Sequence, residues 1–251
     1  MHLYFIRHGQ SVNNAGWGDP DYKESPDPVL TDPGIEQAQL VANFLEAHQQ
    51  VTEPDSWNVQ NEYGFGITHL YASLMERAVH TASYTARKLN VPFQAWDIHE
   101  SGGIFERDYA HGQRHLSQLK GLPGNPRSFY EKNFPEFKLP DSLDGTGWWN
   151  RPFESEEDCQ VRADRIWAEL LARHGDKKGQ PDHRVAFVSH GGFFTHLMCA
   201  ILDLPWRQAS QGLKSWFLLN NCSISRIDVT NEHVTVCYLN RTSHLPSHLI
   251  T

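Results

Sequence analysis

The sequence predicts an α/β protein: a three-layer α/β/α sandwich with a mostly parallel sheet, an antiparallel C-terminal hairpin and a cap insertion. Two observations predict the layers. Apolar runs alternate with amphipathic helical patterns over most of the chain, and the C-terminal part contains only strand-like runs. A third observation predicts the cap, since residues 107–153 are rich in Gly, Pro and aromatic residues. We expect one domain over residues 1–251 with the insertion at about 107–153.

The first strand and helix open the chain. An apolar run at Leu3–Ile6 has the composition of a buried strand. A polar loop follows, and Ile35–Leu45 then shows helical periodicity after Thr31, which we expect to be the N-cap. This segment should pack one face against the sheet.

Two further strand and helix units follow the same plan. Ile67–Ala72 predicts a strand and Glu76–Leu89 the helix after it. A nearly continuous apolar strand at Arg184–Val188 leads into a helix at about Gly191–Leu202. A long amphipathic helix at Ser155–His174 precedes that strand, and Ser155 with Asp158 resembles a capping box at its start. Strands alternating with helices indicate a parallel sheet covered on both faces.

The C-terminal segment predicts three successive strands. These are Trp216–Leu219, Ser223–Val229 and His233–Asn240, with a turn at residues 230–232 joining the last two. We expect this hairpin to complete the sheet.

Composition excludes several classes of protein. The net charge is -8, which argues against nucleic acid as a partner. No apolar stretch approaches the roughly 20 residues that cross a bilayer, and no signal-like segment opens the chain, so we expect a cytoplasmic protein with no membrane partner. The 4 cysteines are widely spaced, which predicts free and mostly buried thiols instead of disulfides or a zinc site. An anionic substrate would need a local cationic pocket.

Two histidine pairs have helical spacing, His111 with His115 and His244 with His248. Neither pair is accompanied by a recognisable set of carboxylate and cysteine ligands. We interpret them as loop and tail histidines, and predict neither a metal site nor a cofactor.

Three predicted strands end in residues suited to an anion. They are followed by Arg7-His8-Gly9, by Ser73-Leu74-Met75-Glu76-Arg77 and by Ser189-His190-Gly191-Gly192. Ligands of open parallel sheets bind beyond the carboxyl ends of the strands, where helix N-termini also favour anions. Guanidinium groups bind phosphate through paired charge-assisted hydrogen bonds. We therefore predict a phosphate site at this edge.

The chain resembles the histidine phosphatase superfamily, which includes the cofactor-dependent phosphoglycerate mutases. The resemblance covers roughly residues 2–100 and 155–240. It rests on four motifs in the family's order, namely Arg7-His8-Gly9-Gln10-Ser11 with Asn14 downstream, Leu30-Thr31-Asp32-Pro33-Gly34-Ile35-Glu36-Gln37-Ala38, Ser73-Leu74-Met75-Glu76-Arg77-Ala78-Val79-His80-Thr81-Ala82, and Ser189-His190-Gly191.

The resemblance implies that His8 is the nucleophile and becomes a phosphohistidine. It places Arg7, Arg77 and His190 around the phosphoryl group, with Asn14 assisting, and we add Gly191 as a substrate-binding position at a helix N-terminus. The physical chemistry agrees, because a neutral imidazole attacks without a separate base and adjacent guanidinium groups oppose its protonation. Cationic side chains can stabilise the charge on the phosphoryl oxygens.

The leaving oxygen also needs a proton. The family places a glutamate after the second helix, where Glu100 matches by position and Glu106 is the competitor. Glu106-Arg107-Asp108-Tyr109 only partly matches the longer Glu-Arg-His-Tyr-Gly signature of the mutases. This difference favours a phosphatase over a mutase.

The insertion contains Gly147-Trp148-Trp149-Asn150-Arg151-Pro152-Phe153. Two indoles, an amide and an arginine could line the pocket for the part of the substrate beyond the phosphate. They could equally form a small aromatic core that holds the insertion in place. The sequence leaves both open.

The leading hypothesis is a phosphomonoesterase that hydrolyses a phosphorylated small molecule or phosphopeptide through a phosphohistidine. The alternatives are phosphoglycerate mutase-type phosphoryl transfer and a non-catalytic phosphate-binding protein on the same fold. Release of inorganic phosphate without added metal or bisphosphoglycerate would discriminate among them. The sequence does not determine the oligomeric state.

Overall fold

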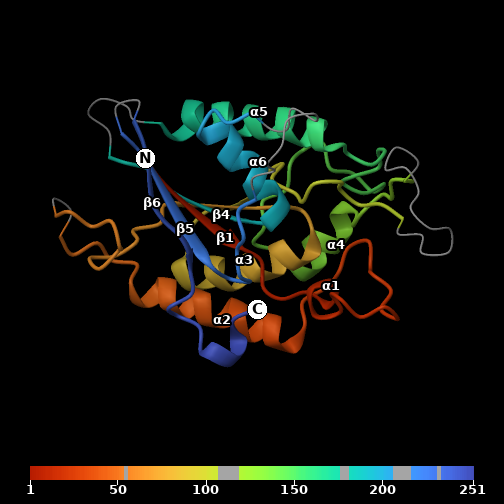
Figure 1. Ribbon diagram of the computed structural model, residues 1–251, viewed down its shortest axis with the longest axis horizontal. Coiled ribbons are helices and arrows are strands. Elements are labelled where there is room, and N and C mark those ends of the chain that lie inside the picture. The colour runs from red at the N-terminus through yellow and green to blue at the C-terminus, as the bar shows by residue number, and fades with distance from the viewer. Residues whose placement is uncertain (54–55, 107–118, 176–180, 206–215, 231–232) are drawn as a thin grey trace.

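A computed structural model describes residues 1–53, 56–106, 119–175, 181–205, 216–230 and 233–251. Within these ranges a six-stranded sheet has the order β3-β2-β4-β1-β5-β6. Its strands are β1 (His2–Arg7), β2 (His69–Ala72), β3 (Phe93–Ala95), β4 (Arg184–Ser189), β5 (Ile224–Thr230) and β6 (His233–Arg241). Figure 1 labels its strands β4, β1, β5 and β6.

The sheet is parallel on one side and antiparallel on the other. The strands β3, β2, β4 and β1 are parallel, whereas β5 is antiparallel to both β1 and β6. The predicted C-terminal hairpin is therefore confirmed, although its predicted turn includes residues 231–232, which lie outside the described part of the chain.

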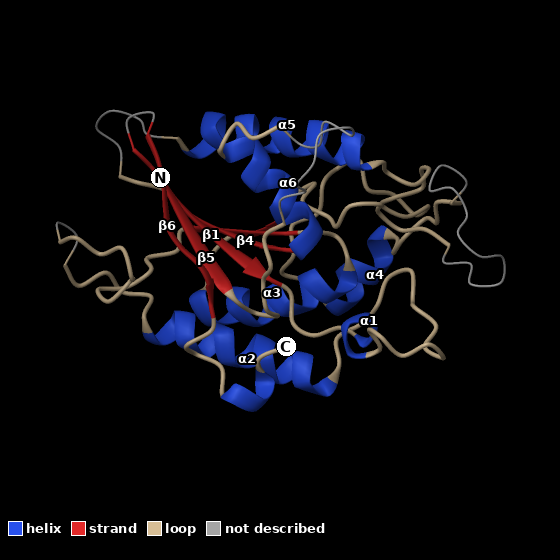
Figure 2. Ribbon diagram, viewed as in Figure 1, coloured by secondary structure: helices blue, strands red, loops and turns tan. Residues whose placement is uncertain are grey.

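Helices cover both faces of the sheet. The helices α2 (Asp32–Ala47) and α3 (Glu76–Leu89) lie on one side, and α5 (Glu156–His174) and α6 (Gly191–Ile201) on the other (Figure 2). Short elements complete the fold: α1 (Val12–Ala15), α4 (Arg127–Asn133) and a 3-10 turn at Ser247–Leu249. The predicted three-layer α/β/α architecture is confirmed.

The central strand β1 shows why two helical layers form. Its residues Tyr4 and Ile6 join the apolar cluster on the α2 and α3 side, while Leu3 and Phe5 join the cluster beneath α5 and α6. All four side chains are fully buried. Because successive side chains of a strand point to opposite faces, an uninterrupted apolar run requires a core on each side.

The main helices begin where the sequence predicts. Thr31 caps α2 by accepting from the Gly34 amide, and Ser155 caps α5 by accepting from the Asp158 amide. The predicted bounds of α3 agree with the structure. These starts are set by local hydrogen bonding, which the sequence reveals directly.

One predicted strand is wrong. Trp216–Leu219 contains no strand, because side chains bind its backbone where a neighbouring strand would be needed. The Arg7 guanidinium donates to the Leu219 carbonyl, and the Phe217 amide donates to the Thr195 hydroxyl. The short elements α1, α4 and β3 were not predicted, since segments of this length have weak sequence patterns.

Part of the insertion is described. In α4 the buried Tyr130 donates its hydroxyl hydrogen to the Leu74 carbonyl, which fastens the helix beside the start of α3. Residues 107–118, including His111 and His115, lie outside the described residues. The assignment of one domain with a cap at 107–153 stays a prediction. None of the helices described here is both long and apolar enough to cross a membrane.

Candidate active site

The register of the parallel strands brings the predicted motifs together. Arg7 pairs with Ser189 across β1 and β4, so the residues that follow, His8 and His190, leave the sheet side by side. The His8 amide donates to the Ser189 carbonyl at 2.9 Å, and the two imidazole rings have centroids 5.0 Å apart. The carboxyl edge of the sheet therefore carries a pair of buried histidines.

The tautomer of His8 is set by its two hydrogen bonds. Nδ1 lies 2.7 Å from the Gly9 carbonyl oxygen, which can only accept, so Nδ1 carries the hydrogen. Arg77 Nε can only donate, and it donates to His8 Nε2 at 3.1 Å. Both partners therefore leave a lone pair on Nε2.

The charge state of His8 follows from its surroundings. Burial lowers the pKa of its imidazole well below the usual range, and the guanidinium groups of Arg77 and Arg7 lower it further. A protonated ring would lose its hydration and face two cations. The ring is thus kept neutral, which is the nucleophilic form.

A close backbone approach explains the glycine after His8. A Cβ atom on Gly9 would lie 2.4 Å from the Gly34 carbonyl oxygen. The Gly9 amide donates to the Thr81 hydroxyl at 3.0 Å, and that hydroxyl donates to the Arg77 carbonyl at 2.7 Å. Only glycine allows the loop to pass here, so the Gly9 position also fixes the peptide that orients His8.

Arg77 enters the site from the first turn of α3 and is buried. Besides its bond to His8, its Nη1 lies 3.7 Å from a carboxylate oxygen of Asp27, a residue that the sequence analysis missed. Burial raises the pKa of Asp27 to about 7, although the charge of Arg77 opposes the shift. Burial thus weakens Asp27 as a counterion for Arg77, whose positive charge remains beside His8.

Arg7, the last residue of β1, contributes a second guanidinium. One of its nitrogens donates to the Leu219 carbonyl, whereas among the described residues its buried Nε has no hydrogen-bond partner. Burial lowers the pKa of this guanidinium, while the charge of Glu100 raises it. A buried donor without a partner requires an explanation, and a bound anion would supply one.

His190 occupies the N-cap position of α6 and is fully buried. Its Nε2 lies 2.9 Å from the Ser73 hydroxyl, which follows β2. Its Nδ1 has no hydrogen-bond partner among the residues that the structure describes. Burial and the charge of Arg77 lower the pKa of His190 well below its usual range, so this ring is neutral as well.

Carboxylates accept hydrogen bonds from the backbone amides at the helix N-termini that were expected to bind phosphate. The amides of Gly192 and Phe193 in α6 donate to Glu100 at 3.3 and 2.9 Å. The Glu76 amide at the start of α3 donates to Asp27 at 3.2 Å. The expectation that these amides would face phosphate is therefore wrong in this structure, because nearby carboxylates satisfy them first.

Glu100 lies close to α6. A Cβ atom on Gly192 would be 2.2 Å from its carboxylate, and the Ser101 amide adds a third backbone donor at 3.0 Å. Glu106, the competing candidate, is exposed, and its amide donates to the Lys120 carbonyl. Of the two, Glu100 shares a cavity with His8.

Asn14 and Gly191 hold more peripheral positions. The Asn14 side-chain oxygen accepts from Ser11 and, at 3.2 Å, from Asn221, which also donates to the His8 carbonyl. Asn14 is thus linked to the His8 backbone through Asn221, a residue not predicted. Gly191 opens α6 beside Arg7, since an added Cβ atom would lie 3.8 Å from Arg7 Nε.

A cavity of about 190 Å³ unites most of the predicted residues. Arg7, His8, Asn14, Arg77 and Glu100 line it, whereas His190 and Gly191 do not. The remaining lining residues were not predicted as site residues, and they are Ser11, Asn13, Trp17, Glu24, Pro26, Pro28, Met75, Ser101 and Gly103. Four of them, Trp17, Glu24, Pro26 and Pro28, come from the irregular loop between α1 and α2, for which no sequence pattern predicts a position at the site.

The aromatic residues of the insertion lie elsewhere. Trp149 is buried against Met75 and Ile104, and the Arg151 guanidinium lies 4.0 Å from its ring centre. Trp148 and Trp149 line a separate cavity of about 510 Å³ instead of the cavity at His8. The packing of Trp149 matches the aromatic-core interpretation of residues 147–153, and the cavity that both indoles line matches the pocket interpretation, although it is not the cavity at His8.

The other histidine and cysteine predictions can also be compared with the structure. His244 is partly buried and bonds to the Cys222 carbonyl, while His248 is exposed. The 4 cysteines are free and three of them are buried, as predicted.

Together, the sheet order and the cavity define a class: an α/β protein with a neutral histidine between two arginines, beyond the carboxyl ends of parallel strands. The profile of the histidine phosphatase superfamily (branch 1) matches residues 3–53 and 60–242. The chain belongs to this superfamily.

Individual relatives are distant. The chain is 26% identical over 234 residues to a probable phosphoglycerate mutase of Proteus mirabilis, covering 92% of this chain and 86% of the relative. It is 25% identical over 205 residues to a glucosyl-3-phosphoglycerate phosphatase of Mycobacterium tuberculosis, covering 81% and 76%.

Solved structures share the fold. A mycobacterial glucosyl-3-phosphoglycerate phosphatase in complex with VO3 has a TM-score of 0.56 at 20% identity, covering 96% of this chain and 99% of that one. A phosphoserine phosphatase mutant of Entamoeba histolytica, in complex with phosphoserine, has a TM-score of 0.55 at 18% identity, covering 98% and 99%.

Proposed function

We propose that this protein is a phosphomonoesterase that hydrolyses a phosphorylated small molecule through a phosphohistidine at His8. The observation that carries the proposal is the state of His8. Its ring is neutral, its Nδ1 hydrogen is engaged by Gly9, and its Nε2 lone pair meets Arg77 in a cavity. This is the form that a nucleophile requires.

In the first step the Nε2 lone pair of His8 forms a bond to phosphorus as the P–O bond of the ester breaks. The Arg77 donor that faces Nε2 is then free to bind a phosphoryl oxygen. Among the described residues, Arg7 Nε and His190 Nδ1 are buried and have no hydrogen-bond partner, so they are further groups that can stabilise the negative charge on the phosphoryl oxygens. If the Ser73 hydroxyl donates its hydrogen to His190 Nε2, the ring hydrogen of His190 lies on Nδ1, which can then donate to a phosphoryl oxygen.

Glu100, in its protonated form, gives a proton to the leaving oxygen and becomes a carboxylate, and the second step returns a proton to it. Water then attacks phosphorus, the N–P bond breaks, and the carboxylate accepts a proton from that water. The support for Glu100 is its position in the same cavity as His8, beside the N-terminus of α6. Asn14 and Gly191 support the site indirectly, through Asn221 and through the packing of Arg7.

The size of the cavity and the named relatives of this chain both favour a small substrate. A volume of about 190 Å³ suits a phosphoryl group with a small organic part. Relatives are named for phosphoserine and glucosyl-3-phosphoglycerate, which are phosphate monoesters. We place mutase activity second, because the exposed Glu106 lies outside the cavity lining.

The test measures release of inorganic phosphate from phosphoserine, 3-phosphoglycerate, glucosyl-3-phosphoglycerate and nitrophenyl phosphate, without added metal or bisphosphoglycerate. We expect turnover of at least one ester, and a phosphoenzyme that His8→Ala removes. His248→Ala, at an exposed histidine, is the matched control and should keep both.

Three outcomes would contradict the proposal. Substantial labelling of the His8→Ala protein would remove His8 as the nucleophile. Transfer of the phosphoryl group to added phosphoglycerate without release of phosphate would indicate a mutase. Phosphate binding without any turnover would indicate a binding protein.

A further inference from the structure

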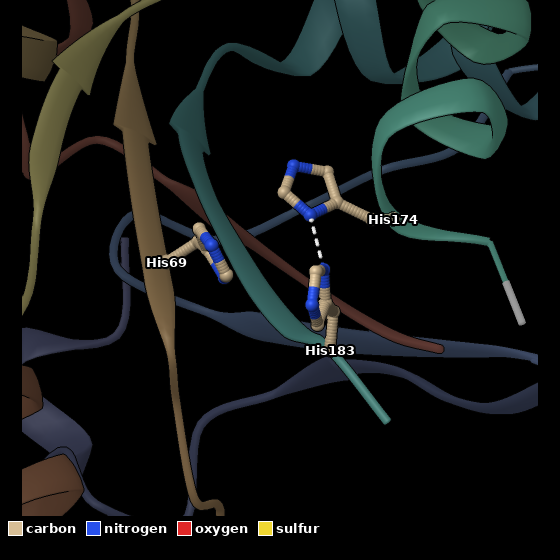
Figure 3. Close-up of side chains that lie close together, drawn as sticks. All are labelled: His69, His174 and His183. Atoms are coloured by element: carbon tan, nitrogen blue, oxygen red, sulfur yellow. Dashed lines mark hydrogen bonds between the residues drawn. The ribbon is translucent and has the colours of Figure 1, made fainter. Parts of the chain in front are cut away.

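A second group of histidines lies at the opposite edge of the sheet (Figure 3). His69 begins β2, His174 ends α5 and His183 directly precedes β4. One ring nitrogen from each lies within 4.8 Å of those of the other two. Because β2 and β4 are parallel neighbours, their first residues meet at this edge, as their last residues meet at the candidate active site.

We propose that His69, His174 and His183 form a binding site for a divalent transition-metal ion, with zinc the best match. Imidazole nitrogen is a preferred ligand of zinc, and three protein ligands leave one coordination position open. This site is independent of the proposed phosphatase reaction.

The distances between the rings suit a shared ion. Zinc lies about 2.0–2.1 Å from each histidine nitrogen, so two nitrogens on one tetrahedral ion are roughly 3.3 Å apart and their ring centres roughly 5 Å apart. The ring centroids here are 4.6, 4.8 and 5.1 Å apart. The Nδ1 atoms of His174 and His183 are 2.9 Å apart and the nitrogens of all three residues lie within 4.8 Å, so coordination requires rotations that bring each pair to roughly 3.3 Å.

Hydrogen bonds outside the cluster orient two of the rings. Nε2 of His174 lies 3.0 Å from the Tyr71 hydroxyl, so Nε2–H can donate there while Nδ1 faces His183. Nδ1 of His69 lies 2.8 Å from the Thr68 hydroxyl, which leaves Nε2 available. Partners of this kind commonly fix the tautomer of metal-binding histidines.

The proton count is consistent with an ion. In the arrangement described, one of the two facing Nδ1 atoms of His174 and His183 must carry the hydrogen that the other accepts. An ion that binds both lone pairs requires this ring to adopt its other neutral tautomer, in which the hydrogen lies on Nε2, so the ring stays neutral and no net proton is released.

The ion would join segments that are distant in sequence. It would connect the C-terminal end of α5 to the starts of β2 and β4, on the side of the sheet away from His8. A ligand that binds only the folded chain stabilises it. Zinc at a hundredfold excess over its Kd should raise the Tm by roughly 5 to 10 °C.

The experiment measures zinc affinity of the full chain by competition with a chromophoric chelator after metal has been removed, and the visible spectrum with cobalt as a probe. We expect one zinc per chain and a tetrahedral cobalt spectrum. His69→Ala and His183→Ala, at half-buried positions, should each weaken zinc binding by about a hundredfold or more, since even outer partners contribute 10- to 100-fold. His248→Ala should bind zinc like the unaltered protein.

A second variant separates the ion from simple packing. Tyr71→Phe removes the hydroxyl next to His174 and should weaken zinc binding about 10- to 100-fold while the chain stays folded by circular dichroism. Unchanged zinc affinity in both His69→Ala and His183→Ala would overturn the proposal. So would binding that is lost in His8→Ala instead, or a Tm of the unaltered protein that zinc does not change.

Discussion

The parallel strands β1, β2 and β4 separate two groups of histidines that differ in how their nitrogens are paired. His8 and His190 lie beyond the carboxyl ends, and each bonds to a group other than an imidazole, namely Gly9 and Arg77 for His8 and Ser73 for His190. At the amino ends, Nδ1 of His174 faces Nδ1 of His183.

The difference shows how surroundings assign a role to one side-chain type. A lone pair held beside a guanidinium, with its tautomer fixed by a carbonyl, suits attack on phosphorus, where negative charge must be stabilised. Lone pairs that converge on one point suit a cation. The predictions below test this contrast from the largest expected effect to the smallest.

The largest effect should come from Glu100→Gln at the carboxyl-end site. If Glu100 protonates the leaving oxygen, hydrolysis of alkyl phosphates should slow by on the order of 10² to 10⁴. Formation of the phosphoenzyme from nitrophenyl phosphate should slow far less, since nitrophenolate leaves without a proton. Presteady-state kinetics on both substrates would measure this.

Glu106→Gln is the matched control and should leave the rates with both substrates unchanged, because Glu106 is exposed. Equal slowing of both substrates in Glu100→Gln would instead indicate loss of the contacts that Glu100 makes with α6. If only Glu106→Gln showed a loss of rate that depends on the leaving group, Glu106 would be the proton donor instead of Glu100.

Arg77→Ala should have the next largest effect. It removes a charged donor to His8 Nε2, and hydrogen bonds to charged groups contribute about 1.5–3 kcal/mol, or roughly 10- to more than 100-fold in kcat/KM. The same charge lowers the pKa of His8, so the variant should also lose activity more steeply below about pH 6.5.

Arg87→Ala provides the control on the same helix. Arg87 is exposed and pairs with Glu136, so its loss should leave kcat/KM and its pH profile unchanged. If Arg77→Ala behaved like Arg87→Ala, the electropositive character of the site would not depend on Arg77.

His190 should make stability depend on pH. Its pKa is lowered in the folded protein, so between about pH 6.5 and that lower pKa the unfolded chain binds more protons. The free energy of unfolding therefore falls as the pH falls through this window, by at most about 1.4 kcal/mol per pH unit for this group.

Replacing His190 with glutamine removes that titration while keeping a hydrogen-bonding side chain near Ser73. Urea unfolding at pH 7.0 and about 5.5 should show a smaller loss of stability in His190→Gln than in the unaltered protein. The exposed His248→Gln should not alter the loss. Parallel pH profiles for all three proteins would contradict the assignment.

The smallest expected effect separates the two ends of the sheet most directly. Chelation should leave phosphate release unchanged, because Arg7 and Arg77 supply the positive charge next to His8. The same treatment should remove any increase of the Tm that zinc produces. Loss of turnover in EDTA, restored by zinc, would show that the two ends are not independent.

The sequence alone determined the architecture and the residues at the carboxyl edge. The bounds of α3 and the caps Thr31 and Ser155 agree with the structure because periodicity and capping depend on residues within a turn or two of one another. Motifs placed after successive parallel strands must meet at one edge, so Arg7, His8 and Arg77 could be grouped in advance.

Only the tertiary structure decided how these groups are satisfied. Glu100 and Asp27 take the helix N-termini that we expected for phosphate, and Arg7 binds the backbone of Leu219, where we expected a strand. The grouping of His69, His174 and His183 likewise depends on the register of β2 with β4 and on the end point of α5. Such contacts join segments that are distant along the chain, and their geometry is set by packing, for which the local pattern carries no signal.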